Sequence, residues 1–505
     1  MSRTRRFLGG LGLGFIGQVV ITVVGLWLTP FLLRRLGQHD YGLWLVALQT
    51  TAYFGLLDLG VVALLPRETA YAVGRGGGRD DNAELPAVVG RTARLVFWQF
   101  PVIVLAAVAT WLLLPDEWSA LQRPFGVIIA VFVVMFPLRI LHATLQGLQE
   151  LAYIGAVQLG TWVLGTVTTI SLVLSGWGLY ALAVGWGASQ LVSAVLWWAR
   201  LRRRFPGALP SALPRLTWGA VRPQVASGLW VSAGQIAQVL VNATDLVIIG
   251  RLLGPAAVVP YAITGKLVSV LANQPQMVMQ AAMPALSEVR ASEQRHRLRS
   301  IASALTQAML LISGLVVVVV LVVNQGFVSW WVGREMFGGA SLTLLLLTSM
   351  LLRHWNTTSV YTLFCFGYER RISITTLFDG LITATASLLL VHFLGVKGAV
   401  LGSIVGVCLV SLPSNLIVLA REAGTSPVGL IRPLGAWFWR LIVLSALAIY
   451  VAGRWVPRTF ESLAASGVIA ASLYIVVMLP VALRSNLGAY LPPRLVPLFA
   501  RLRRA

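Results

Sequence analysis

Residues 7–33 read FLGGLGLGFIGQVVITVVGLWLTPFLL, a stretch of 27 residues without a charged side chain. About 20 mostly apolar residues in a helix are enough to cross the hydrocarbon core of a bilayer. Three arginines precede the stretch, as in a secretory signal, but the stretch is too long for one and has no small-residue cleavage site. Similar stretches follow it along the whole chain. It is therefore interpreted as the first membrane span.

Thirteen more apolar segments of similar length predict a polytopic, all-α membrane protein of about fourteen transmembrane helices. The predicted spans are 7–33, 41–65, 93–114, 124–146, 153–174, 178–199, 225–250, 257–284, 301–323, 341–364, 373–394, 398–420, 437–456 and 463–483.

The composition supports this class. Of 505 residues, 57% are hydrophobic and 11% are charged, whereas about 25% are charged in a typical soluble domain. The net charge of +22 could indicate a nucleic-acid binder, but the arginines lie in short runs between apolar segments, which is the membrane pattern. The two cysteines, Cys365 and Cys408, lie in apolar segments and give no disulfide framework or metal-ligand spacing.

The basic residues also predict the orientation. Most of the 39 Lys and Arg fall on the side of the membrane that holds both termini, including the run at Arg200 and Arg202–Arg204. By the positive-inside rule this side is cytoplasmic. The opposite loops are short, so no outer catalytic domain is expected, and a bacterial inner-membrane location is predicted.

The chain shows an internal duplication. Leu253-Gly254 repeats Leu36-Gly37 at an offset of 217 residues, and three further matches lie at offsets of 218–220: Pro66 with Pro284, Gly147 with Gly367, and Gly178 with Gly398. Six spans per copy means that both copies insert the same way up, which predicts two lobes with a site between them. The expected parts are an N-lobe at 1–205, a C-lobe at 206–420, and two extra helices with a tail at 421–505.

Charged residues inside the spans are expected to face a cavity or a partner, because each costs about 2.5–3.5 kcal/mol at the bilayer centre. Uncharged polar residues share helical faces with several of them. The charged residues in spans are Asp58, Arg139, Asp245, Lys266, Arg353 and Asp379, and the polar residues grouped with them are Gln18, Gln235, Gln238, Asn242, Asn273, Gln276 and Asn356.

Two interpretations of these polar stripes compete. The uncharged residues could join helices across a dry interface, or they could line a water-filled lumen, which we favour for spans 225–250 and 257–284. The candidate residues for binding an anionic headgroup are the uncharged set above with Lys266, Arg353 and Arg139, because ammonium and guanidinium groups bind phosphate oxygens. The alternative is that each basic residue pairs with an aspartate, such as Lys266 with Asp245.

Asp58, Asp245 and Asp379 are candidates for coupling to H+ or Na+, since protonation costs less than burying a bare carboxylate. No other cofactor, no metal and no catalytic residue is expected.

The stretch PFLLRRLG at 30–37, YGLW at 41–44, LLDLG at 56–60 and Arg67 resemble the opening of Wzx-type polysaccharide flippases. These form part of the multidrug/oligosaccharidyl-lipid/polysaccharide exporter (MOP) superfamily, and the loops at Gly147, Gly367 and Gly395–Gly398 are similar to that family too. The resemblance covers the whole chain in length, span count and duplication.

This resemblance implies two six-helix lobes in a V around a central cavity that opens alternately to each side. It implies a flippase for polyprenyl-pyrophosphate-linked oligosaccharides, such as undecaprenyl-pyrophosphate O-antigen units, with the two extra helices forming a groove for the lipid tail. The partners expected are this glycolipid and membrane lipids, with a glycan polymerase as an optional partner and no nucleic acid, and the protein is expected to be a monomer. The alternatives are a small-molecule or drug antiporter of the same fold, and a membrane glycosyltransferase or polymerase.

Overall fold

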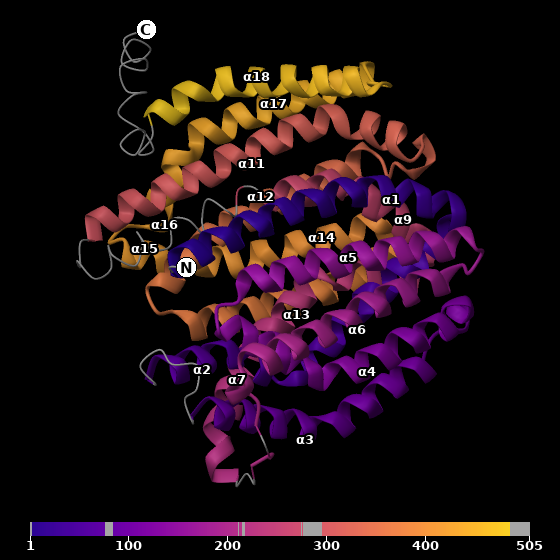
Figure 1. Cartoon of the computed structure of the whole chain (residues 1–505). Helices are drawn as coiled ribbons and strands as arrows, with labels where there is room; N and C mark the ends of the chain where they lie inside the picture. The colour runs from indigo at the N-terminus through magenta and orange to yellow at the C-terminus, as the bar shows by residue number, and fades with distance from the viewer. Residues whose placement is uncertain are drawn as a thin grey trace. The chain divides into compact units, whose positions relative to one another are not determined.

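The computed structural model describes residues 3–75, 84–210, 212–214, 218–273, 275 and 295–484. Helices make up almost all of this part of the chain, and it contains no β-strand. The all-α prediction is confirmed. Figure 1 traces the elements in chain order.

Two compact units divide the chain, one of residues 1–236 with 254–256 and one of 237–253 with 257–505. The helices of the first unit begin and end as follows: α1 Arg3–Phe54, η1 Gly55–Asp58, α2 Val61–Arg75, α3 Glu84–Leu112, η2 Asp116–Trp118, α4 Ser119–Gly147, α5 Leu151–Leu174, α6 Leu179–Arg204, η3 Pro206–Ala208, and α7 Trp218–Asn242, which continues into the second unit.

The second unit holds the remaining helices. They are α8 Thr244–Leu252, α9 Pro255–Thr264, an unlabelled helix Lys266–Asn273, α11 Arg295–Trp331, η4 Arg334–Met336, α12 Ala340–Cys365, α13 Glu369–Leu394, α14 Val396–Gly406, the π-helix η5 Val407–Ser411, α15 Leu412–Glu422, α16 Pro427–Ile431, η6 Arg432–Leu434, α17 Gly435–Arg454 and α18 Phe460–Arg484.

By length and apolarity, ten described helices can cross a membrane, or up to twelve if each of two bent pairs counts as one span. The predicted number of fourteen is larger for two physical reasons. The first predicted span and the first part of the second fall in the single helix α1, which is kinked at Gly37 (φ 82°, ψ 167°). The helix α12 contains Arg353 and His354, which lower its apolarity.

The duplication can be seen in the backbone of the turns. Gly37 and Gly254 both have positive φ, at 82° and 88°, a region in which glycine carries no steric penalty. Gly178 and Gly395 both precede a helix with nearly the same dihedral angles, φ 53°, ψ −134° and φ 60°, ψ −146°. The structural counterpart of Gly178 is therefore Gly395, at the offset of 217, rather than the Gly398 that we expected.

Helix packing repeats as well. The helices α5 and α6 pack together in the first unit, as α13 and α14 do in the second. Ser193 donates a hydrogen bond to Thr161 (2.9 Å), and 218 residues later Ser411 donates one to Asp379 (2.6 Å). The same pair of buried positions thus joins two neutral side chains in one copy and holds a carboxylate in the other.

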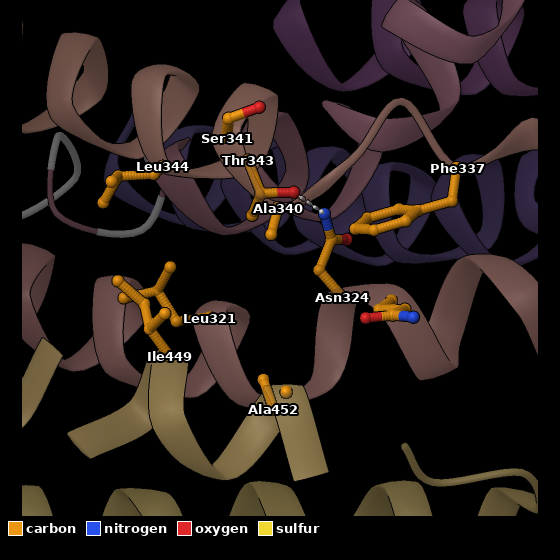
Figure 2. A pocket seen from close by; sticks show the side chains of 11 residues that line it. Leu321, Asn324, Phe337, Ala340, Ser341, Thr343, Leu344, Ile449 and Ala452 are labelled. Carbon is orange, nitrogen blue, oxygen red and sulfur yellow. Dashed lines mark hydrogen bonds between the residues drawn. The ribbon is translucent and has the colours of Figure 1, made fainter. Parts of the chain in front are cut away.

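The two C-terminal helices α17 and α18 run alongside α11, as Figure 1 shows at its upper edge. A cavity of about 320 Å³ lies between α11, α12 and α17 (Figure 2). On its wall the buried amide of Asn324 donates hydrogen bonds to Thr343 Oγ1 and to the Thr264 carbonyl, each at 3.0 Å. A second cavity of about 230 Å³ between α11, α17 and α18 is mostly apolar.

Candidate substrate-binding site

Asp58 lies where the second predicted span is broken. The 3₁₀ turn η1 ends at this residue, and Leu59 and Gly60 follow with positive φ, at 49° and 68°. The break leaves backbone groups without helical partners, and Asp58 Oδ1 accepts a hydrogen bond from the Gly60 amide at 2.8 Å. Its side chain is completely buried, so a cation is needed beside it.

Arg139 on α4 supplies that cation, with Nη2 3.1 Å from Asp58 Oδ2. The pairing of a basic residue with an aspartate, which we kept open as an alternative, is therefore observed for Arg139. Its other terminal nitrogen, Nη1, is buried and has no acceptor among the described residues. One half of this guanidinium neutralises Asp58, and the Nη1 of the other half is a buried donor without a described partner.

A pocket of about 670 Å³ surrounds Arg139 within the first unit, in the range of about 300–1,000 Å³ that is usual for ligand sites. The residues of α4 that line it recur every three or four positions, as one helical face must. The lining residues are Thr51, Val62, Ala63, Pro66, Arg67, Phe132, Met135, Arg139, His142, Ala143, Gln146, Trp186, Gln190 and Trp197.

The pocket is basic. The described lining includes the guanidinium groups of Arg67 and Arg139 and the imidazole of His142, and it includes no Asp or Glu. His142 packs its ring on Trp197 with 4.8 Å between the ring centroids. The Trp197 side chain is 92% buried, and its indole N–H has no acceptor in the part of the chain that the structure describes. Arg139 Nη1 and Trp197 Nε1 are thus buried polar atoms beside the pocket rather than on its accessible surface.

Two other predicted charges lie at helix breaks of the second unit. The helices α7 and α8 meet at a bend of 48°, and Asp245 lies in the first turn of α8. The helices α9 and Lys266–Asn273 meet at 46°, and Lys266 is the first residue after that bend. Broken helices of this kind carry substrate and ion sites in several transporter folds, because their free ends present polar backbone groups.

Asp245 and Lys266 do not pair with each other. Asp245 Oδ2 accepts a hydrogen bond from the Tyr261 hydroxyl at 2.7 Å, and Lys266 forms no ion pair with any described residue. The alternative that joined them across the Gly254-Pro255 turn is therefore wrong in this structure. Asp245 Oδ1 has no donor in the described part of the chain.

Arg353 is held in a network at the π-helix η5. Its Nη1 lies 3.4 Å from Asp379 Oδ2, and Ser411, the last residue of η5, donates to the same oxygen at 2.6 Å. Arg353 also donates to the Ser403 hydroxyl and carbonyl and to the Thr383 hydroxyl, at 2.9–3.3 Å. Most of its donors are thus used within the protein, and Asp379 is nearly completely buried. The predicted role of Arg353 in phosphate binding stays a prediction, and it requires this network to open.

The uncharged candidate residues are divided. Asn242 donates to the Gln238 side chain (2.9 Å), and both residues are exposed. Gln18 and Asn273 are exposed too, whereas Gln235 is half-buried with an unpartnered Oε1. Asn356 accepts a hydrogen bond from Asn415 at 2.9 Å. Gln276 lies outside the described residues. The sequence predicts one helical face for Gln235, Gln238, Asn242 and Asp245. The 48° bend after Asn242 separates Asp245 from the other three residues.

Sequence reasoning did not find the wall of the basic pocket. Trp186, Gln190 and Trp197 lie on one face of α6, and Gln146 continues the face of α4 that carries Arg139 and His142. The periodicity of α4 was a usable signal, because Arg139, His142 and Gln146 follow a helical spacing in an otherwise apolar span. The α6 face carried no charge and gave no such signal.

The chain is similar in sequence to one protein family and in fold to several solved structures. Residues 102–337 match the model of a family described as "Polysaccharide biosynthesis protein". No curated protein matches the chain. An inward-facing multidrug resistance MATE family transporter of the MOP superfamily has a TM-score of 0.63 at 13% identity, and the alignment covers 83% of this chain and 99% of the transporter.

Two further solved structures have similar folds. The lipid II flippase MurJ in an inward closed conformation has a TM-score of 0.64 at 10% identity, covering 92% of this chain and 98% of MurJ. A MOP superfamily transporter from Pyrococcus furiosus, reported with a binding pocket of reverse polarity, has a TM-score of 0.54 at 13% identity, covering 84% and 96%.

The chain is therefore a multi-pass membrane protein with the fold of the MOP superfamily transporters. The resemblance to polysaccharide flippases of this superfamily, predicted from sequence, is confirmed by the fold together with the family match in residues 102–337. The similar solved structures are transporters and a flippase, and the family match is to a polysaccharide biosynthesis protein.

Proposed function

We propose that the protein moves a polyprenyl-pyrophosphate-linked oligosaccharide from the inner to the outer leaflet of a bacterial inner membrane by alternating access. The observation that carries the proposal is the basic pocket around Arg139 in a transporter fold. A pyrophosphate offers oxygen acceptors to the guanidinium groups of Arg139, whose side chain is 34% exposed, and of Arg67, and charge-assisted hydrogen bonds are the strong ones.

The predicted orientation gives the pocket a direction. With cytoplasmic termini, α2, α4 and α6 all run from the outer to the inner side, so Arg67, Gln146 and Trp197 lie nearer the cytoplasm than Phe132 and Trp186. From Phe132 to Gln146 the helix rises about 21 Å, against a hydrocarbon core of about 30 Å. The exposed side chains of Arg67 and Gln146 form the mouth. This arrangement suits loading of the headgroup from the cytoplasmic leaflet.

The exposed polar residues on broken helices also support transport. Lipid-facing amides are costly in hydrocarbon, so the exposure of Gln238, Asn242 and Asn273 favours a water-lined surface over a dry helix interface. Lys266 forms no ion pair with a described residue, and it is a further cation, beside Arg139 and Arg67, that can bind a pyrophosphate during transport.

A drug antiporter of the same fold is the competing function, because one of the similar structures is a multidrug transporter. Export of cationic drugs needs acidic groups on the walls of the binding cavity. The described pocket lining has none, and Asp58 beside it is neutralised by Arg139. The pocket therefore favours an anionic substrate.

Transport by the purified full-length protein in vesicles tests the proposal. The probe is a fluorescent oligosaccharide on polyprenyl pyrophosphate, loaded in the outer leaflet, and its movement is followed by quencher accessibility. We expect the wild-type protein to accelerate movement well above protein-free vesicles. We expect Arg67→Gln to slow it about tenfold, because a hydrogen bond to a charged group contributes about 1.5–3 kcal/mol.

Arg67 is exposed, so this variant should fold normally. The matched control is Arg123→Gln, an exposed arginine at the other end of α4, which should leave the rate unchanged. Wild-type vesicles that move the probe no faster than empty ones would refute the function. If Arg67→Gln moves the probe as fast as the wild-type protein does, the pocket does not take part in transport.

A further inference from the structure

The basic pocket has two chemically different walls. The α2 and α4 wall holds Arg67 and Arg139, whose guanidinium groups suit phosphate. The α6 wall holds Trp186, Gln190 and Trp197, which are spaced by four and seven residues and so lie on one helical face. No charged group is on this second wall, so the charge-assisted hydrogen bonds to phosphate come from the α2 and α4 wall.

Aromatic and amide groups suit a sugar ring. The π-face of an aromatic ring is electron-rich and attracts the C–H groups of a pyranose face. A glutamine amide offers two donors and one acceptor oxygen, which match hydroxyl groups in either role.

The two walls belong to one pocket of about 670 Å³, so a single ligand meets both. We propose that the pocket binds a sugar 1-phosphate unit, with the sugar ring against Trp186 and Gln190 and its phosphate at Arg139 and Arg67. The inference rests on the proposed function and deepens it. The first sugar of the lipid-linked glycan is recognised by the α6 wall, and the lipid diphosphate by the α4 wall.

The binding of two short-chain probes to the full-length protein in detergent distinguishes the contributions of the two walls. The probes are farnesyl diphosphate and the same molecule carrying one glucose on its terminal phosphate, with affinity measured by calorimetry. We expect Trp186→Leu and Gln190→Leu to weaken the glycosylated probe about tenfold, which corresponds to 1.4 kcal/mol, and to leave farnesyl diphosphate within about twofold of wild type. The control Trp198→Leu changes an exposed tryptophan outside the pocket and should alter neither affinity.

The outcomes distinguish the two proposals. If the α6 variants weaken both probes equally, or neither, the sugar wall is refuted while a flippase with a phosphate site stands. If Arg67→Gln weakens both probes and the α6 variants weaken only the glycosylated one, the assignment of both walls holds. If the wild-type protein binds neither probe, the sugar site fails, and the flipping assay decides the function separately.

Discussion

Asp58, Asp245 and Lys266 lie at irregular points of the helices, whereas Arg139, Arg353 and Asp379 lie within α4, α12 and α13. Asp58 ends a 3₁₀ turn, Asp245 and Lys266 follow bends of 48° and 46°, and the Arg353–Asp379 pair is bonded to a π-helix. A regular helix satisfies its own backbone, whereas a break exposes N–H and C=O groups that can solvate a charge in a low-dielectric region. The breaks therefore reduce the cost of placing these charges in the membrane.

Among the three candidate coupling residues, Asp245 differs in its partner. Asp58 and Asp379 lie beside arginines, whereas Asp245 accepts only from the Tyr261 hydroxyl and has one oxygen without a donor in the described part. We expect Asp245→Asn to remove the response of flipping to an imposed proton or sodium gradient, because the amide cannot exchange a proton or neutralise a cation.

The measurement is the ratio of vesicle flipping rates with and without each gradient. The control Asp116→Asn changes an acidic residue of the loop between α3 and α4 and should keep the wild-type ratio. A gradient response that survives in Asp245→Asn would make this carboxylate structural.

At the scale of elements, glycine decides how closely the repeated hairpins pack. A Cβ at Gly398 of α14 would lie 2.2 Å from the Leu390 backbone carbon of α13, and the backbone cannot move aside. We expect Gly398→Ala to lower the thermal midpoint of unfolding in detergent, since overpacking costs about 1–3 kcal/mol. The control Gly160→Ala on α5 meets no atom within 4 Å and should keep or raise the midpoint. Equal midpoints would show that the hairpin tolerates a wider separation.

The sequence predicted the helices better than their interruptions. Apolar length and the turn glycines located most elements, because these signals are local. The break at Asp58 was missed, since Gly55–Gly60 continues an apolar segment and only the positive φ of Leu59 and Gly60 reveals the turn. The partner of Asp245 was missed for a related reason: the bends at 243 and 265 change which side chains face one another, and helical periodicity assumes that no bend exists.

For the whole molecule, the predicted orientation can be tested directly. In a variant with Cys365 and Cys408 replaced by alanine, we expect Asp116→Cys to react with a membrane-impermeant maleimide in intact cells. Ser426→Cys, between α15 and α16, should react only after the membrane is permeabilised, because the arginine distribution places it in the cytoplasm. The reverse labelling pattern would invert the proposed topology and with it the direction of loading.

The fold class and the multi-pass character were predictable from the sequence, because hydrophobicity and spacing determine them. The superfamily was indicated by resemblance, through stretches such as PFLLRRLG at 30–37 and LLDLG at 56–60. The pocket was only partly predictable. Arg139 was identified as an intramembrane cation. The α6 wall of the pocket depends on how α2, α4 and α6 pack together, and no single segment of the sequence encodes this packing. The lobe boundaries and the coupling ion stay predictions.

The repeated turns and the unrepeated charges together describe how such a carrier arises. Gly37 matches Gly254 and Gly178 matches Gly395 in backbone conformation, yet Arg353 falls opposite Phe136 at the same offset. An ancestral half of about six helices, fused head to tail with its own copy, would leave the same turn glycines in both copies. At this offset the cation is present in one copy and absent from the other. Proteins that descend from one such fusion can therefore keep the same turns while they transport different substrates.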